Sequence, residues 1–111
     1  MKLKEIQILI NVLEKNRVLT LNTFGNSMYP AIKMNDKIVI KQIDKNISEK
    51  DIVVFFDKID EDYFVVAHRV EKIIDNEILL TKGDNNKRYD PIVKKSNVLG
   101  KVIEIIREEE P

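Results

Sequence analysis

One short segment of the chain places a serine where it could act as a nucleophile. This segment is Gly25-Asn26-Ser27-Met28-Tyr29-Pro30, and it follows a predicted strand directly. Glycine permits sharp backbone geometry and proline prevents a helix from continuing, so the segment predicts a rigid turn that exposes the Ser27 hydroxyl. The same residue types are also the commonest in ordinary turns. Serine becomes a nucleophile only beside a general base.

The candidate base is His68, which is the single histidine of the chain. Alternation along a strand places it on the same face as Val66 and Val70, so it is a polar group among apolar neighbours. That setting fits a hydrogen-bonded structural histidine, but imidazole also titrates near neutral pH and is suited to proton transfer. With one histidine and no cysteine, we expect neither a metal site nor a cofactor.

Two carboxylates, Asp84 and Asp90, lie in a polar segment after another predicted strand. Aspartates in such loops often only accept hydrogen bonds from backbone N–H groups of the turn. A carboxylate that orients an imidazole is the functional alternative. The order Asp84-x-Asn86 is similar to the start of a calcium loop, but Gly83 precedes the aspartate and no glutamate closes the loop, so we expect no calcium.

The elements that must position these groups can be predicted from the spacing of apolar residues. Residues 3–15 have the apolar spacing of one helical face and form an amphipathic helix, which Asn16 can end by adopting a left-handed conformation. The segments rich in Val, Ile and Phe predict strands at 18–21, 37–42, 51–56, 63–74, 77–81 and 98–106.

Short polar segments between these strands predict hairpins. Asp60-Glu61-Asp62 and Asp75-Asn76 are both short enough to join antiparallel neighbours. The predicted fold class is therefore mainly β: an antiparallel β domain at 17–106 with one N-terminal amphipathic helix. We expect one domain over 1–111 and a frayed tail at 107–111.

Composition excludes several classes of function. Basic and acidic residues both number 19, so no excess of positive charge favours nucleic acid as a partner. The chain contains no cysteine, which excludes disulfide scaffolds and thiolate chemistry. No apolar run approaches the roughly 18 residues of a membrane span, so we expect a soluble, cytoplasmic protein without an integral membrane anchor. The sequence leaves the oligomeric state open.

Taken in order, these segments resemble motifs of the type I signal peptidases, and in particular of the branch that uses a histidine base. The resemblance covers roughly residues 20–104. The motifs that carry it are Gly25-x-Ser27-Met28-x-Pro30, Asp51-Ile52-Val53-Val54-Phe55, His68-Arg69-Val70, Thr81-Lys82-Gly83-Asp84-Asn85-Asn86 with Asp90, and Leu99-Gly100-Lys101-Val102.

The resemblance implies a serine endopeptidase on the fold shared by signal peptidases and repressor peptidases. Ser27 would attack the peptide carbonyl, His68 would take the hydroxyl proton, and the Ser27 N–H would donate to the oxyanion. Asp90 is the first choice for orienting His68, and Asp84 is the second choice or a loop-shaping neighbour. The implied partner is an extended peptide or precursor protein, with small residues near the cut.

Three departures and two alternatives accompany this interpretation. Lys50 and Asn35 stand where the family usually has glycine, which predicts two altered turns, and a helix replaces the membrane anchor, which argues against secretory signal peptides as substrates. One alternative is a peptide-binding module without catalysis. The other, a self-cleaving repressor, resembles this family with a lysine base and a helix-turn-helix domain. Neither feature is predicted here. Lys72 would lie too far from the reacting atoms, and the roughly 15 residues before the first predicted strand are too few for that domain.

Overall fold

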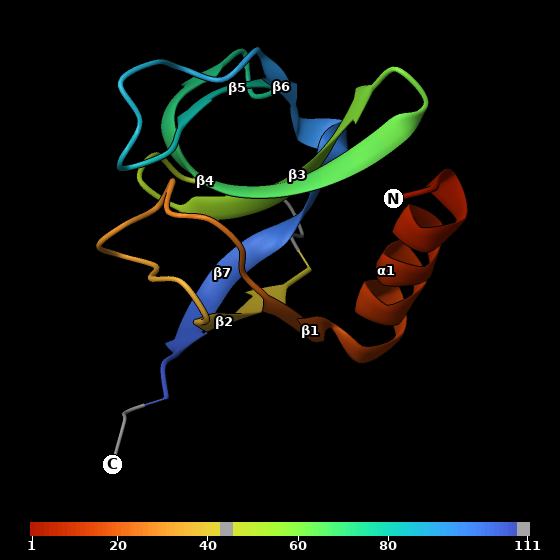
Figure 1. Cartoon of the computed structure of the whole chain (residues 1–111). Helices are drawn as coiled ribbons and strands as arrows, with labels where there is room; N and C mark the ends of the chain where they lie inside the picture. The colour runs from red at the N-terminus through yellow and green to blue at the C-terminus, as the bar shows by residue number, and fades with distance from the viewer. Residues whose placement is uncertain (43–45, 109–111) are drawn as a thin grey trace.

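An antiparallel sheet of seven strands forms most of the molecule, and one helix packs beside it (Figure 1). The computed structural model describes residues 1–42 and 46–108. Along the sheet the strands follow the order β1-β2-β7-β3-β4-β5-β6. The elements are α1 (Leu3–Asn16), β1 (Val18–Asn22), β2 (Lys37–Lys41), β3 (Ile52–Ile59), β4 (Asp62–Ile74), β5 (Ile78–Lys82), β6 (Val93–Lys94), a 3-10 turn (Lys95–Asn97) and β7 (Val98–Ile106). The predicted fold class is confirmed.

The core consists of two apolar clusters on opposite faces of the sheet. Successive strand residues point to opposite faces, so Val54 of β3 lies in one cluster while Val53 and Phe55 lie in the other. This division explains why β3 is apolar without alternation. The first cluster contains Leu13, Met28, Ile32, Ile38, Ile40, Val54 and Leu99, and the second contains Val53, Phe55, Val70, Leu79, Val93 and Val98.

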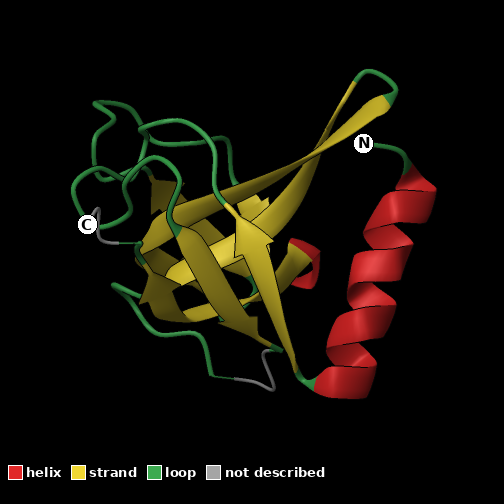
Figure 2. Ribbon diagram, turned by 60° about the horizontal axis from the view of Figure 1, so that its bottom comes forward, coloured by secondary structure: helices red, strands yellow, loops and turns green. Residues whose placement is uncertain are grey.

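The helix α1 covers one side of the sheet (Figure 2) and buries Ile6 and Leu13. At its start the Glu5 side chain accepts a hydrogen bond from the Lys2 backbone N–H. It extends one residue beyond the predicted end, because the left-handed residue that terminates it is Arg17 (φ 70°) and not Asn16. In the described parts of the chain, no helix is long and apolar enough to cross a membrane.

The predicted strand bounds are wrong mainly where polar residues continue the pairing of two strands, or where a strand is very short. β3 runs to Ile59, three residues past its predicted end, because its polar end pairs with the start of β4. β6 was not predicted, since two residues carry no detectable period. Both predicted hairpins join antiparallel strands, and Asp60, Asp75 and Asn76 have the positive φ angles that such tight turns require.

β4 has different neighbours along its two halves. Its pairing with β3 extends from Asp62 to Arg69, whereas its pairing with β5 begins only at Arg69. Among the described strands, residues 62–68 of β4 therefore have a partner on one edge alone. His68 lies directly before the position where the second partner begins.

The loop between β1 and β2, which contains Ser27, is attached to the end of β7. The buried Asp36 carboxylate accepts hydrogen bonds from the Lys33 backbone N–H and the Arg107 guanidinium, and Arg107 holds the pKa of Asp36 below its usual range. The expectation of a frayed tail is thus wrong at Arg107, because this residue is ion-paired at 2.7 Å. Residues 109–111 of that predicted tail lie outside the described residues.

Two turn residues adopt the left-handed conformation that glycine favours. Asn35 has φ 72° and Lys50 has φ 76°, and these are the two positions where the resemblance led us to expect glycine. Asparagine tolerates this region, but a lysine Cβ does not fit it well. Lys50 is therefore a strained residue in an otherwise ordinary turn.

We predict that Lys50→Gly raises the free energy of unfolding by about 0.5–1 kcal/mol, because relief of a left-handed Cβ penalty of about 1–2 kcal/mol exceeds the added chain entropy of glycine. Urea unfolding followed by circular dichroism measures the change. Asn35→Gly is the control, and it should change stability by only a few tenths of a kcal/mol. Unchanged or reduced stability of Lys50→Gly would show that position 50 is not strained.

Candidate active site

Ser27 lies in a compact turn soon after β1. Gly25 has φ 78°, a conformation that residues with a side chain rarely adopt, and the Tyr29 N–H then donates to the Asn26 carbonyl. The next residue, Met28, is buried in the first apolar cluster. The turn is therefore fixed on both sides of the serine.

His68 projects from β4 on the face of the sheet that carries the second apolar cluster. It lies opposite Val53 of β3 and is only 7% exposed. The Phe55 ring meets the imidazole edge-on, with 6.3 Å between the ring centroids. These two neighbours from β3 limit the rotation of the imidazole ring.

The structure brings Ser27, His68 and Asp90 into one row. The Ser27 Oγ lies 2.9 Å from His68 Nε2, and the Asp90 Oδ2 lies 2.7 Å from His68 Nδ1. An ionised carboxylate can only accept hydrogen bonds, so Nδ1 carries the proton and Nε2 of the neutral ring accepts from the Ser27 hydroxyl. These three predicted residues come from segments 41 and 22 positions apart in the chain.

Asp84, the second-choice carboxylate, pairs with a different residue. Its two oxygens accept hydrogen bonds from Arg69 Nε and NH2 at 2.8 and 2.7 Å. Arg69 also donates to the Lys50 carbonyl. The Arg69 hydrogen bonds hold the pKa of Asp84 below its usual range, although partial burial opposes this shift. Asp84 therefore has the position of a loop-shaping residue.

The loop that contains Asp84 also supports the backbone of the Ser27 turn. Asn85 donates its backbone N–H to the Ser27 carbonyl at 2.8 Å and its side-chain amide to the Asn26 carbonyl at 3.1 Å. Gly83 lies so close that an added Cβ would be 2.6 Å from the Ser27 carbonyl oxygen. Glycine is required at this position because the two backbones are in contact.

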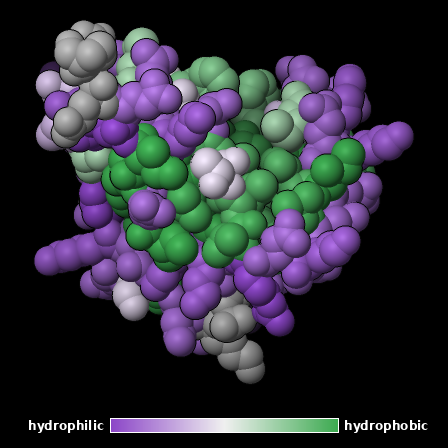
Figure 3. All heavy atoms as spheres, turned by 90° about the horizontal axis from the view of Figure 1, so that it is seen from below, coloured by the Kyte–Doolittle hydropathy of each residue, from purple (hydrophilic) through white to green (hydrophobic). Residues whose placement is uncertain are grey.

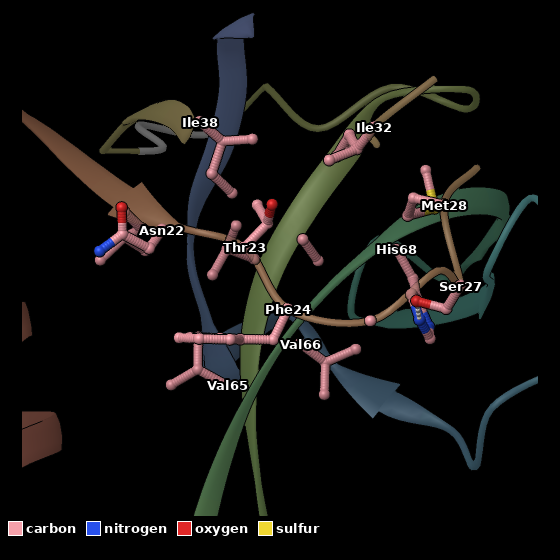
Figure 4. Close-up of a pocket in the computed structure, with 14 residues that line it drawn as sticks. Asn22, Thr23, Phe24, Ser27, Met28, Ile32, Ile38, Val65, Val66 and His68 are labelled. Carbon is pink, nitrogen blue, oxygen red and sulfur yellow. Dashed lines mark hydrogen bonds between the residues drawn. The ribbon is translucent and has the colours of Figure 1, made fainter. Parts of the chain in front are cut away.

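A pocket of about 300 Å³ opens beside the serine and the histidine. Figure 4 shows Ser27 and His68 at one end of this pocket, with Asn22 and Ile38 toward the other. Phe24, also in its lining, is 90% exposed. The apolar residues of the lining are Leu21, Phe24, Met28, Ile32, Ile38, Val54, Val65, Val66 and Ala67.

The surface as a whole is not uniformly polar. Seen from below the view of Figure 1, one face has a broad apolar area bordered by polar side chains (Figure 3).

Over residues 1–42 and 46–108, no group of three or more His, Cys, Asp or Glu side chains is arranged to hold a metal ion. The Ser27 hydroxyl and the His68 imidazole line the pocket, and the Asp90 carboxylate contacts that imidazole.

Fold and sequence together define the class of this protein. Residues 3–103 match the family described as Peptidase S24-like, and the chain belongs to that family. The match supports the wider group of peptidases that includes both the self-cleaving repressors and the signal peptidases, and it does not single out the type I signal peptidases. Comparison with curated protein sequences finds no significant match.

Three residues of the site were quoted in motifs but given no role from the sequence. Arg69 binds Asp84, Asn85 binds the Ser27 turn, and Thr81 donates to Asp90. These contacts join segments that are distant in the chain, or they fix the direction of a side chain. The local spacing of residues predicts neither a long-range contact nor a side-chain direction. The one available signal was the density of polar residues in the segment 81–90.

We predict that Gly83→Ala displaces the Ser27 turn, because the new Cβ meets the Ser27 carbonyl and a backbone atom cannot turn aside as a side chain can. The cost is about 1–3 kcal/mol of stability, as for other overpacked sites. Because His68 is the only histidine, its ring signals in NMR spectra report the change without ambiguity.

Gly100→Ala is the matched control for this variant. Its Cβ would meet the Lys41 carbonyl at 2.5 Å, so it should also destabilise the protein, but by a contact with β2 in place of the Ser27 turn. Both variants should unfold at lower urea concentration, and Gly83→Ala should shift the His68 ring signals more. Equal shifts in the two variants would contradict a specific role for Gly83.

We predict that Asp84→Asn lowers the free energy of unfolding at neutral pH by about 1–2 kcal/mol, through loss of its charged hydrogen bonds to Arg69. The folded-state pKa of Asp84 lies below the unfolded value near 3.8, so this stability is present above about pH 4 and is lost as pH falls through the folded pKa. The difference between wild type and variant should therefore shrink below pH ~4.

Urea unfolding at pH 7, 5, 4 and 3 is the measurement for this pair. Asp60→Asn, at the exposed tip of the β3–β4 hairpin, is the control for loss of a carboxylate. A wild-type advantage over Asp84→Asn that stays constant down to pH 3 would refute the ion-pair contribution.

Proposed function

We propose that the chain is a serine endopeptidase of the histidine-using, signal-peptidase-like kind. Ser27 is the nucleophile, His68 is the general base and Asp90 orients the base. The observation that carries the proposal is the row of hydrogen bonds from Ser27 Oγ through the imidazole to Asp90, located at one end of an apolar pocket. The family to which the chain belongs supports the reaction class.

The reaction begins when Ser27 Oγ attacks the carbonyl carbon of the scissile peptide bond. His68 Nε2 takes the hydroxyl proton during the attack and then donates it to the leaving amine, which frees one product and leaves an ester on Ser27. Water, activated by the same nitrogen, hydrolyses the ester. Proton transfer of this kind accelerates a step by about 10²- to 10⁴-fold.

Negative charge that develops on the carbonyl oxygen needs a donor close to Ser27. Within the described parts of the chain, the Ser27 backbone N–H donates to no other residue. It is therefore available to the oxyanion without first breaking a hydrogen bond in the protein. The Asn85 side-chain amide donates to the Asn26 carbonyl, which shares a peptide plane with the Ser27 N–H, so the direction of this N–H is set before substrate binds.

The proposed substrate is an extended segment of a peptide or precursor protein. The edge of β4 before His68 has no strand partner among the described residues, and it lines the pocket together with the end of β1. An extended segment bound along that edge would make backbone hydrogen bonds and place an apolar side chain in the pocket. The same geometry would suit a binding module without catalysis, so cleavage itself must be measured.

We predict that Ser27→Ala and His68→Ala each lower kcat by about 10³-fold or more on any peptide that the wild type cleaves, because each removes a group that takes part in bond making. Asp90→Asn keeps nucleophile and base, yet it should lower kcat by about 10²- to 10⁴-fold through loss of the favoured imidazole tautomer. Asp84→Asn is the matched control and should retain most activity, since it contacts Arg69 and not His68.

Peptide-library digestion followed by mass spectrometry gives substrates, and titration of Ser27→Ala with the same peptides separates binding from cleavage. The base must be the neutral form of His68, because an imidazolium cannot accept the Ser27 proton. Peptide binding without cleavage by the wild type would favour the binding module. A folded His68→Ala protein with wild-type activity would overturn the mechanism.

A further inference from the structure

Thr81 has a buried hydroxyl on a face of β5 that is otherwise apolar. Its side chain is 0% exposed, as is that of Leu79, which lies on the same face of the strand and belongs to the second apolar cluster. Valine has nearly the shape of threonine and would fill the same space. A hydroxyl at such a position is unfavourable unless it makes a hydrogen bond that serves the structure or the site.

The Thr81 hydroxyl donates to Asp90 Oδ2 at 2.7 Å. This is the same oxygen that contacts His68 Nδ1, also at 2.7 Å. In addition, the Asp90 backbone N–H donates to the Thr81 carbonyl at 2.9 Å. Thr81 therefore contacts Asp90 at both its backbone and its side chain.

Two donors on one carboxylate oxygen restrict the carboxylate more than one donor does. A single hydrogen bond from His68 would allow Asp90 to rotate about its Cβ–Cγ bond and offer either oxygen, since sp³–sp² torsions are broad. With Thr81 and His68 both directed at Oδ2, only one orientation satisfies both donors. The imidazole then keeps its proton on Nδ1 and leaves Nε2 as an acceptor for Ser27.

We infer that Thr81 is a positioning residue that acts through Asp90 to maintain the Nδ1-protonated tautomer of His68. The consequence for catalysis rests on the proposed function. The consequence for the tautomer does not, because it concerns three residues of the free protein. The two can therefore be tested separately.

The first measurement is the tautomer of His68 by NMR, at an alkaline pH where the ring is neutral and without any peptide. The two ring nitrogens have distinct ¹⁵N shifts, and the single histidine makes their assignment unambiguous. Wild type and Thr81→Ser, which keeps the hydroxyl, should show Nδ1 protonated and Nε2 unprotonated. Thr81→Val and the smaller Thr81→Ala should show averaged shifts of mixed tautomers.

Thr20→Val is the matched control, because it makes the same exchange at an exposed position of β1 and should leave the tautomer unchanged. A folded Thr81→Val or Thr81→Ala protein with the wild-type tautomer would overturn the inference. If both variants fail to fold, Thr81→Ser still decides: a folded serine variant with mixed tautomers would show that the hydroxyl is not what sets the tautomer.

The second measurement is activity on a peptide that the wild type cleaves. Thr81→Val should lower kcat about 10- to 100-fold with little change in KM, and Thr81→Ser should restore most of the rate, as expected for a group that orients a catalytic residue. Equal rates for valine and wild type would refute the catalytic consequence. Absence of cleavage by wild type would refute the proposed function, but it would not change the conclusion on the tautomer of His68.

Discussion

The site depends on the position at which β5 separates from β4. The two strands are paired from Arg69 to Ile74 of β4, and His68 is the residue of β4 directly before that pairing. From Lys82 the chain leaves the sheet, passes over the Ser27 turn and returns to place Asp90 against the imidazole. One change of strand partner thus creates both the open edge that lines the pocket and the loop that supports the Ser27 turn.

Two ion pairs stabilise the loops on either side of this junction. Arg69 with Asp84 attaches the loop after β5 to the body of β4, and Arg107 with Asp36 attaches the loop after β1 to the end of β7. The loop after β1 also buries Met28 and Ile32 in the first apolar cluster, so apolar packing and charged hydrogen bonds together fix its path. The polar residues around the site therefore divide into those that could react and those that fix backbone positions.

The sequence was sufficient for the fold class and for a peptidase-like family, because both depend on local patterns and motifs. The helix predicted at 3–15 and the last strand predicted at 98–106 follow from apolar spacing. The choice of Ser27 and His68 as candidates follows from turn chemistry and from the presence of a single imidazole. The choice between Asp90 and Asp84 as the partner of His68 could not be made from spacing. It depends on how the loop of residues 83–90 folds back, and that path is set by contacts with Ser27 and Arg69.

β7 is the last strand in the sequence, yet it lies in the middle of the sheet between β2 and β3. On one side of it are β1 and β2, which flank the Ser27 loop, and on the other are β3 and β4, which carry His68. During synthesis these two halves have no strand to join them until residue 106 has left the ribosome. Contact between Ser27 and His68 therefore depends on the pairing of β7 with both halves of the sheet, which is a long-range condition on folding and not a local one.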